Sequence, residues 1–381
     1  MLGINSNINS LVAQQNLNGS QSALSQAITR LSSGKRINSA ADDAAGLAIS
    51  TRMQTQINGL NQGVSNANDG VSMIQTASSA LSSLTSSLQR IRQLAVQAST
   101  GSLSSSDQAA LQKEVSAQIA EVNRIASQTT YNGTNILDGS AGSVTFQVGA
   151  NVGQTISLDL SQSMSAAKIG GGLVQTGQTV GTIAVSLSAT GTYTSTGATI
   201  TSVNVLSDGK GGYTFTDQNN TAITSGVANA IFSAGTGAGS GTAITSLAIS
   251  TAALPTTGAA SGAAIAAVNQ INAINAPPTV SGLDISTVTG ANEAMVSIDN
   301  ALQTVNTLQA ALGAAQNRFT AISTSQQAES TDLSSAQSQI TDANFAQETA
   351  NLSKAQVLQQ AGISVLAQAN SNPQQVLKLL Q

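Results

Sequence analysis

Residues 57–98 read INGLNQGVSNANDGVSMIQTASSALSSLTSSLQRIRQLAVQA, and this stretch decides how the rest of the chain folds. Its apolar residues recur in steps of three and four, and the positions between them hold mostly Ser, Gln, Asn and Thr. The stripe consists of Ile57, Leu60, Val64, Ala67, Val71, Ile74, Leu81, Leu88, Ile91, Ala95 and Ala98. This spacing predicts a helix roughly 60 Å long with one apolar stripe. Because such a helix is stabilised by packing its stripe, the rest of the chain should supply partners.

Two weaker helices flank this stretch in the sequence. From Ile4 to Leu31 an apolar stripe is interrupted by glutamine, and the small residues that follow break the period. Ser39 and Asp42 have the spacing of a capping box, so Asp42 and Asp43 read as helix-start residues, not as a metal or acid pair. The long helix should end near Gly101, where a Ser-rich turn offers N-caps, with Asp107 in the first turn of the next helix. The apolar stripe of that shorter amphipathic helix runs from Leu111 to Ala126.

The period then changes from helical to two. Val144, Phe146 and Val148 alternate with polar residues, and so do Ile156, Leu158 and Leu160, which predicts a β-hairpin. Residues 171–280 are rich in Gly, Thr and Ser and carry only Asp208, Lys210 and Asp217 as charged residues. We expect a separate β-rich domain there, with a short helix near Ala263 to Ile274.

Helical periodicity resumes at about Ala291 and continues for some forty-five residues, a length that matches the 57–98 stripe. The two helices could pack side by side. A last, weak stripe begins at Phe345 and mirrors the N-terminal one, and Pro373 should close it. We therefore expect an α+β protein: a long coiled-coil helical bundle formed by paired N- and C-terminal segments with a β-hairpin, plus an inserted β-rich outer domain.

Composition excludes several classes of function. The 381 residues include no Cys and no His, which removes the usual zinc, copper and haem sites and every Ser-His or Cys-His nucleophile. The net charge is -4, and no basic run exceeds Lys35-Arg36, which argues against nucleic-acid binding. We expect no cofactor, no metal, no enzymatic activity, no secretory signal and no membrane insertion.

Four stretches carry a resemblance to a known family. Residues 5–11 (NSNINSL) and 31–46 (LSSGKRINSAADDAAG) resemble the N-terminal signature of bacterial flagellin. Residues 340–348 (ITDANFAQE) and 372–377 (NPQQVL) resemble its C-terminal signature. Residues 171–280 resemble no family. The likeness implies a subunit of the flagellar filament that is exported unfolded, polymerises at the tip and remains outside the cell.

The resemblance also implies a division of the chain and a set of partners. Residues 1–40 and 342–381 would be terminal helices of the inner core, disordered in the monomer; 41–170 and 281–341 the helical core with its hairpin; and 171–280 a variable, surface-exposed domain. Partners would be further copies of the chain, an export chaperone, and the cap and hook-filament junction proteins. Host Toll-like receptor 5 and a cytosolic inflammasome sensor would recognise it.

Three groups of site residues follow. The self-assembly seam would comprise Ile4, Ile8, Leu11, Leu24, Ile28, Leu31, Phe345, Leu352, Ile363 and Leu366. By resemblance, Toll-like receptor 5 would contact Gln89, Arg90, Leu94, Gln97 and Glu114, and Arg90, Gln93, Leu94 and Gln97 should share the helix face beside the stripe. The same face could instead bind a neighbouring protofilament. The inflammasome sensor would read the C-terminal tail, which contains Val376, Leu377, Leu379 and Leu380.

Three alternatives stay open on the sequence alone. A hook-filament junction protein would share the terminal helices but would join or end a filament. A hydrolase inserted in the middle is disfavoured, because residues 171–280 contain no Glu and no His. A glycan-binding role for this domain has little aromatic surface to support it.

Overall fold

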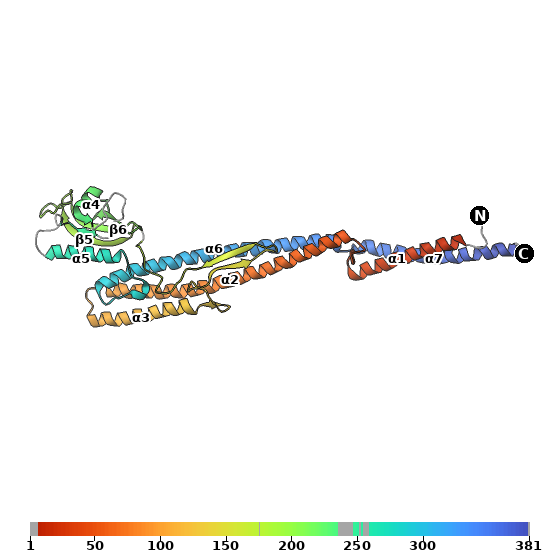
Figure 1. Ribbon diagram of the computed structural model, residues 1–381, viewed down its shortest axis with the longest axis horizontal. Helices are drawn as coiled ribbons and strands as arrows, with labels where there is room; N and C mark the ends of the chain where they lie inside the picture. The colour runs from red at the N-terminus through yellow and green to blue at the C-terminus, as the bar shows by residue number, and fades with distance from the viewer. Residues whose placement is uncertain (1–6, 175, 235–246, 251–252, 254–258, 380–381) are drawn as a thin grey trace. The chain divides into compact units, whose positions relative to one another are not determined.

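The computed structural model describes residues 7–174, 176–234, 247–250, 253 and 259–379 (Figure 1). The chain divides into two compact units. The first contains residues 1–68, 147–155 and 321–381, and the second contains residues 69–146 and 156–320. Two long helices, α2 (Ala44–Ala98) and α6 (Val288–Thr341), contribute to both.

In the first unit, the terminal helices α1 (Ile8–Ser33) and α7 (Phe345–Leu379) lie side by side and antiparallel (Figure 1). At one end Asn7 Nδ2 donates to the carbonyl oxygen of Ala369 at 2.8 Å. At the other end Arg30 Nη1 donates to Glu348 Oε1 at 3.2 Å. The predicted pairing of the N- and C-terminal segments is therefore confirmed.

One predicted helix end is wrong. Pro373 was expected to close the last helix, but α7 continues through it to Leu379. A proline removes one backbone donor and strains the preceding turn, and the remaining backbone hydrogen bonds of this long helix carry it past that position.

The two linkers that join the terminal helices to the long helices bind each other. Gly34 has a positive φ of 71° and ends α1, and its carbonyl oxygen accepts a hydrogen bond from Ala343 N at 2.9 Å. Arg36 N donates to Thr341 O at 2.6 Å, and Arg36 Nη2 donates to Ile340 O at 2.6 Å. The Arg36 guanidinium thus binds a carbonyl at the C-terminus of α6, where a cation is favoured by the helix dipole.

The predicted helix start after this linker is confirmed. Asp43 Oδ1 accepts from Gly46 N at 2.9 Å and caps α2. Asp42 Oδ2 accepts from the backbone nitrogens of Asn38, at 3.2 Å, and Ser39, at 2.9 Å. These hydrogen bonds stabilise the charged carboxylate and hold the pKa of Asp42 below its ordinary value, the bonds from Ser39 contributing most.

Within the first unit, α2 also contacts α6 and the turn of the hairpin. Asn61 Oδ1 accepts from Ser330 Oγ at 3.0 Å. Gly59 and Gly63 face the residues of the hairpin turn, and a Cβ atom at Gly63 would collide with the carbonyl group of Val148. The absence of a side chain at these two glycines lets the turn lie directly on the helix.

In the second unit, α3 (Ser105–Gln128) lies alongside α2 (Figure 1). Ser104 and Asp107 form a capping box at its start, as the Ser-rich turn predicted. Between α2 and α6, Arg92 Nε donates to Asp299 Oδ1 at 2.7 Å. The predicted apolar stripe is confirmed by its fully buried members, which include Ile74, Leu81, Leu88 and Ile91.

The predicted hairpin is also confirmed. Strands β3 (Gly142–Gln147) and β4 (Thr155–Leu160) form a two-stranded sheet, and Ile156, Leu158 and Leu160 of β4 point into the core. A smaller pair, β1 (Thr130–Tyr131) and β2 (Thr134–Asn135), precedes it.

The β-rich region of the second unit has its own core. Its antiparallel three-stranded sheet has the order β5 (Thr179–Leu187), β6 (Ile200–Ser207), β7 (Tyr213–Asp217). A second sheet pairs β8 (Phe232–Ala234) with β9 (Leu247–Ile249), and the helical segments are α4 (Ser225–Ile231), α5 (Ala259–Ile274) and the 3-10 turn η2 (Val280–Gly282). Helix α5 confirms the predicted short helix, whereas α4 was not predicted.

Candidate functional site

The α1–α7 pair carries exposed apolar side chains. The seam between the two helices buries small residues, among them Ala13, Ala27, Ala355 and Ala369. Of the predicted seam residues, Leu24, Leu31, Leu352 and Leu366 are partly buried. The others in the described part of the chain are exposed: Ile8 (65%), Leu11 (69%), Ile28, Phe345 (68%) and Ile363. Small residues fill the space between the two helices, so these five side chains are left accessible to other copies, and their place in a self-assembly seam stays a prediction.

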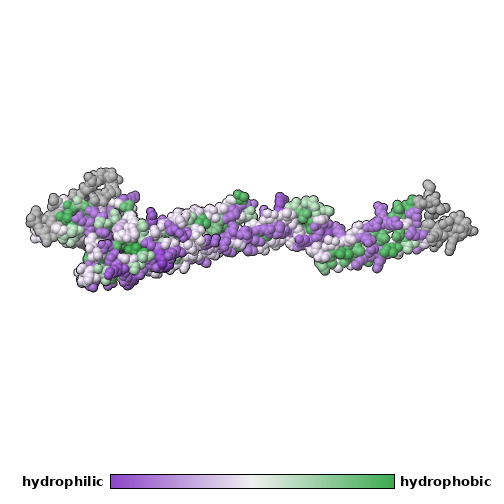
Figure 2. All heavy atoms as spheres, turned by 60° about the horizontal axis from the view of Figure 1, so that its bottom comes forward, coloured by the Kyte–Doolittle hydropathy of each residue, from purple (hydrophilic) through white to green (hydrophobic). Residues whose placement is uncertain are grey.

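Figure 2 shows this surface as green patches among polar residues at the end formed by α1 and α7. Further exposed apolar residues on the same helices are Val12, Val357, Leu358 and Val365. Sequence reasoning missed these four because they lie off the main stripe. They could have been recognised in the sequence because each helix has apolar residues outside its stripe and carries few charges.

Part of the predicted surface cannot be placed. Ile4 and Leu380 lie outside the described residues. Val376, Leu377 and Leu379 lie within α7, but only the backbone of the helix is described there. Recognition of the C-terminal tail by a cytosolic sensor therefore stays a prediction from the sequence.

A second surface joins α2 and α3. Arg90 Nε donates to Glu114 Oε1 at 2.7 Å, and Arg90 Nη1 donates to Gln93 Oε1 at 3.5 Å. Gln89 and Gln97 are exposed beside this cluster. The structure therefore brings together a cation, a carboxylate and several amides on an accessible face.

Leu94 does not belong to that face. It is only 1% exposed and packs in the core of the second unit. The buried surface of α2 is wider than the predicted stripe, because Leu84 and Leu94, which lie outside that stripe, are also buried. Leu94 lies one turn from Arg90, as its spacing predicted, but its side chain is covered by the core and adds no accessible surface beside Arg90.

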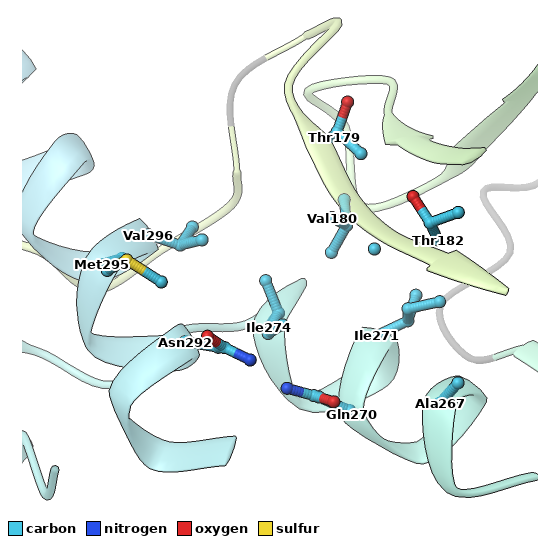
Figure 3. Close-up of a pocket in the computed structure, with 11 residues that line it drawn as sticks. Thr179, Val180, Thr182, Ala267, Gln270, Ile271, Ile274, Asn292, Met295 and Val296 are labelled. Atoms are coloured by element: carbon cyan, nitrogen blue, oxygen red, sulfur yellow. The ribbon is translucent and has the colours of Figure 1, made fainter. Parts of the chain in front are cut away.

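A pocket of about 370 Å³ lies between β5, α5 and the start of α6 (Figure 3). Its apolar lining comes from Val180, Ile271 and Ile274, and the amide side chains of Gln270 and Asn292 point toward one another across it. None of its lining side chains titrates, so the pocket supplies no acid or base for catalysis.

The residues that the structure describes offer neither a metal site nor a membrane span. No cluster of three or more acidic side chains is placed to hold a metal ion. None of the helices described has the length and apolarity to cross a membrane.

Comparison with known families accounts for most of the chain. The model of the bacterial flagellin N-terminal helical region matches residues 4–142, and that of the C-terminal helical region matches residues 295–380. The flagellin D2 domain model matches residues 172–277. The β-rich region, for which the sequence analysis found no resemblance, therefore also has a counterpart.

Individual proteins agree over the whole length. The chain is 36% identical to B-type flagellin of Pseudomonas aeruginosa and 37% identical to flagellin B of Vibrio cholerae, covering 100% of this chain and 99% or more of each relative. The solved structure of FliC from Burkholderia pseudomallei is 65% identical, with a TM-score of 0.60, over 65% of this chain and 99% of that one.

Proposed function

The chain belongs to the bacterial flagellin family, whose members build the extracellular flagellar filament, and we propose that it is exported unfolded and polymerises through α1 and α7. As a filament subunit it serves motility. The chain leaves the cell unfolded, and the filament grows because the terminal helices of each new subunit are buried against other copies.

One observation carries the proposed mechanism of growth. The side chains of Ile8, Leu11 and Phe345 are about two-thirds exposed, so most of their apolar surface is left for contact with other copies. Burying one large apolar side chain fully is worth about 1.5–3 kcal/mol. Several such side chains on each subunit supply enough free energy to hold neighbouring copies together.

One feature of the sequence supports export in an unfolded state. The chain has no Cys, so it forms no disulfide that would have to open. An export chaperone would cover the apolar termini before export, and the cap and hook-filament junction proteins would receive the subunit. In the filament, residues 171–280 would face solvent.

Expression in a flagellin-null bacterium tests this function. We expect the chain to restore long filaments and swimming. A matched variant with Phe345→Gln and Ile363→Gln should be exported but should yield short filaments or none. Secretion of the unmodified chain without any filament would favour a junction protein over a filament subunit and would contradict the proposal.

The Arg90 cluster supports a second role, recognition by Toll-like receptor 5. The Glu114 carboxylate holds the guanidinium of Arg90 at an exposed face, where its remaining N–H groups can donate to a partner. By resemblance, Gln89, Gln97 and Glu114 would join it. Since Leu94 is buried, it would support this face from below.

Receptor-reporter cells separate this role from a structural one. Arg90→Ala should weaken activation roughly tenfold or more, because a charged hydrogen bond is worth about 1.5–3 kcal/mol. Arg124→Ala is the matched control, since Arg124 forms an exposed ion pair with Glu121 on α3. Equal activity of the two variants would contradict the assignment. Recognition of the C-terminal tail by a cytosolic sensor is tested in the same way, by deleting residues 376–381.

A further inference from the structure

A buried ion pair crosses the seam between α1 and α7. Glu348 is nearly inaccessible, and one of its carboxylate oxygens accepts from Arg30 Nη1 at 3.2 Å. The other oxygen accepts from Asn351 Nδ2 at 3.3 Å. Both oxygens of this carboxylate are therefore satisfied, and α1 supplies the cation that neutralises it.

The two residues are unusual for their helices. Arg30 is the one charged residue in the sequence of α1, residues 8–33. Glu348 is the one acidic residue in the sequence of α7, residues 345–379. Among all relative positions of the two helices, only one places a cation of α1 beside a carboxylate of α7.

Apolar packing selects this position weakly. The buried side chains of the seam are mostly alanines, and Gly362 faces Leu17. Small side chains repeated at helical spacing pack comparably when one helix slides by a turn. After such a slide Glu348 would face no cation, and leaving one member of a buried ion pair without its partner is strongly unfavourable.

The hydrogen bonds between the linkers fix the antiparallel orientation of the two helices. We propose that Arg30 and Glu348 set the register of α1 on α7 beyond the linkers. The pair acts as a specificity element, in the way that a polar residue in a coiled-coil seam fixes alignment at a cost in stability. The consequence for assembly rests on the proposed function: subunits with a slipped seam would present their exposed apolar residues out of place to the next copy.

The absence of cysteine allows the register to be read directly. A Cβ atom at Gly362 would lie 3.8 Å from Cβ of Leu17, which is the spacing of a disulfide. The full chain with Leu17→Cys and Gly362→Cys should therefore cross-link within one molecule under assembly conditions. Leu17→Cys with Leu358→Cys, or with Leu366→Cys, reports a slip by one turn in either direction.

Charge variants in this background test the proposal. Arg30→Glu or Glu348→Arg should lower the ratio of in-register to slipped cross-links by roughly tenfold or more. The double exchange, Arg30→Glu with Glu348→Arg, should restore the ratio. Lys354→Glu changes an exposed charge on α7 and should have no effect.

Three results would overturn the proposal: an unchanged ratio in the single variants, no restoration in the double exchange, or no cross-link between positions 17 and 362 in the chain with native charges. Filament growth is scored separately in each sample. If the chain with native charges forms the 17–362 cross-link but no filament grows, only the proposed function is contradicted. If filaments grow and the cross-link ratio does not depend on the charges at positions 30 and 348, only this inference is contradicted.

Discussion

The ring of Phe319 on α6 lies directly against the backbone of Gly70 on α2, so that a Cβ atom at Gly70 would stand 2.7 Å from the ring. Phe319 is completely buried and meets the ring of Phe146 edge-on, with 5.3 Å between centroids. Three elements, α2, α6 and β3, therefore converge on one aromatic side chain.

This contact predicts opposite effects for two glycine-to-alanine changes. Gly70→Ala gains about 1 kcal/mol of helix propensity but forces the buried ring to move, which costs about 1–3 kcal/mol. We expect net destabilisation. Gly313→Ala, on α6 with open space around it, should stabilise by about 0.5–1 kcal/mol. Guanidinium unfolding followed by circular dichroism measures both, and a Gly70→Ala chain as stable as Gly313→Ala would refute the packing described.

The exposed termini predict a separation of folding from assembly. Phe345→Gln should leave unfolding of the monomer unchanged but raise the critical concentration for filament growth roughly tenfold or more, since it removes an apolar side chain buried only between copies. Leu173→Gln, a change at an apolar side chain that is 52% exposed in the region predicted to face solvent, is the control. Light scattering of seeded samples gives both values, and equal critical concentrations would argue against α7 as an assembly surface.

Periodicity predicted most of the helical architecture and the hairpin. The 57–98 stripe, the capping residues near Asp43 and Ser104, and the β3–β4 alternation are local signals, and tertiary packing does not override them. Periodicity did not predict that Leu94 is buried and that Phe345 is exposed. Whether an apolar side chain is buried depends on the size of the residues opposite it, and that information lies in a distant part of the chain.

Two other features needed the folded structure. The close approach of the hairpin turn to Gly59 and Gly63 joins residues almost a hundred positions apart. The pairing of Arg30 with Glu348 spans most of the chain. The sequence shows that these helices contain few charged residues and few glycines. Which residues the charges and glycines contact is known only from the folded chain.

The turn around Asp42 predicts a pH dependence. Because the pKa of Asp42 is lower in the folded state than its ordinary value of 3.8, its stabilising effect is complete above that value. It is lost as the pH falls through the folded-state pKa. The protection factors of the Asn38 and Ser39 amides, which correct the exchange rates for their intrinsic pH dependence, should therefore fall on acidification below about pH 4. Asp42→Asn should exchange faster at neutral pH and lack this transition, and an identical pH profile in the two proteins would contradict the role of the carboxylate.

The most direct test of the account is seeded elongation of the purified full chain. Short filament fragments are mixed with monomer, and growth is followed by light scattering and microscopy beside a version that lacks residues 1–40. We predict that the full chain extends the seeds and that the truncated chain, which lacks α1, does not. Growth by the truncated chain would show that the terminal helices are not required, and failure of the full chain to extend its own seeds would contradict its role as the filament subunit.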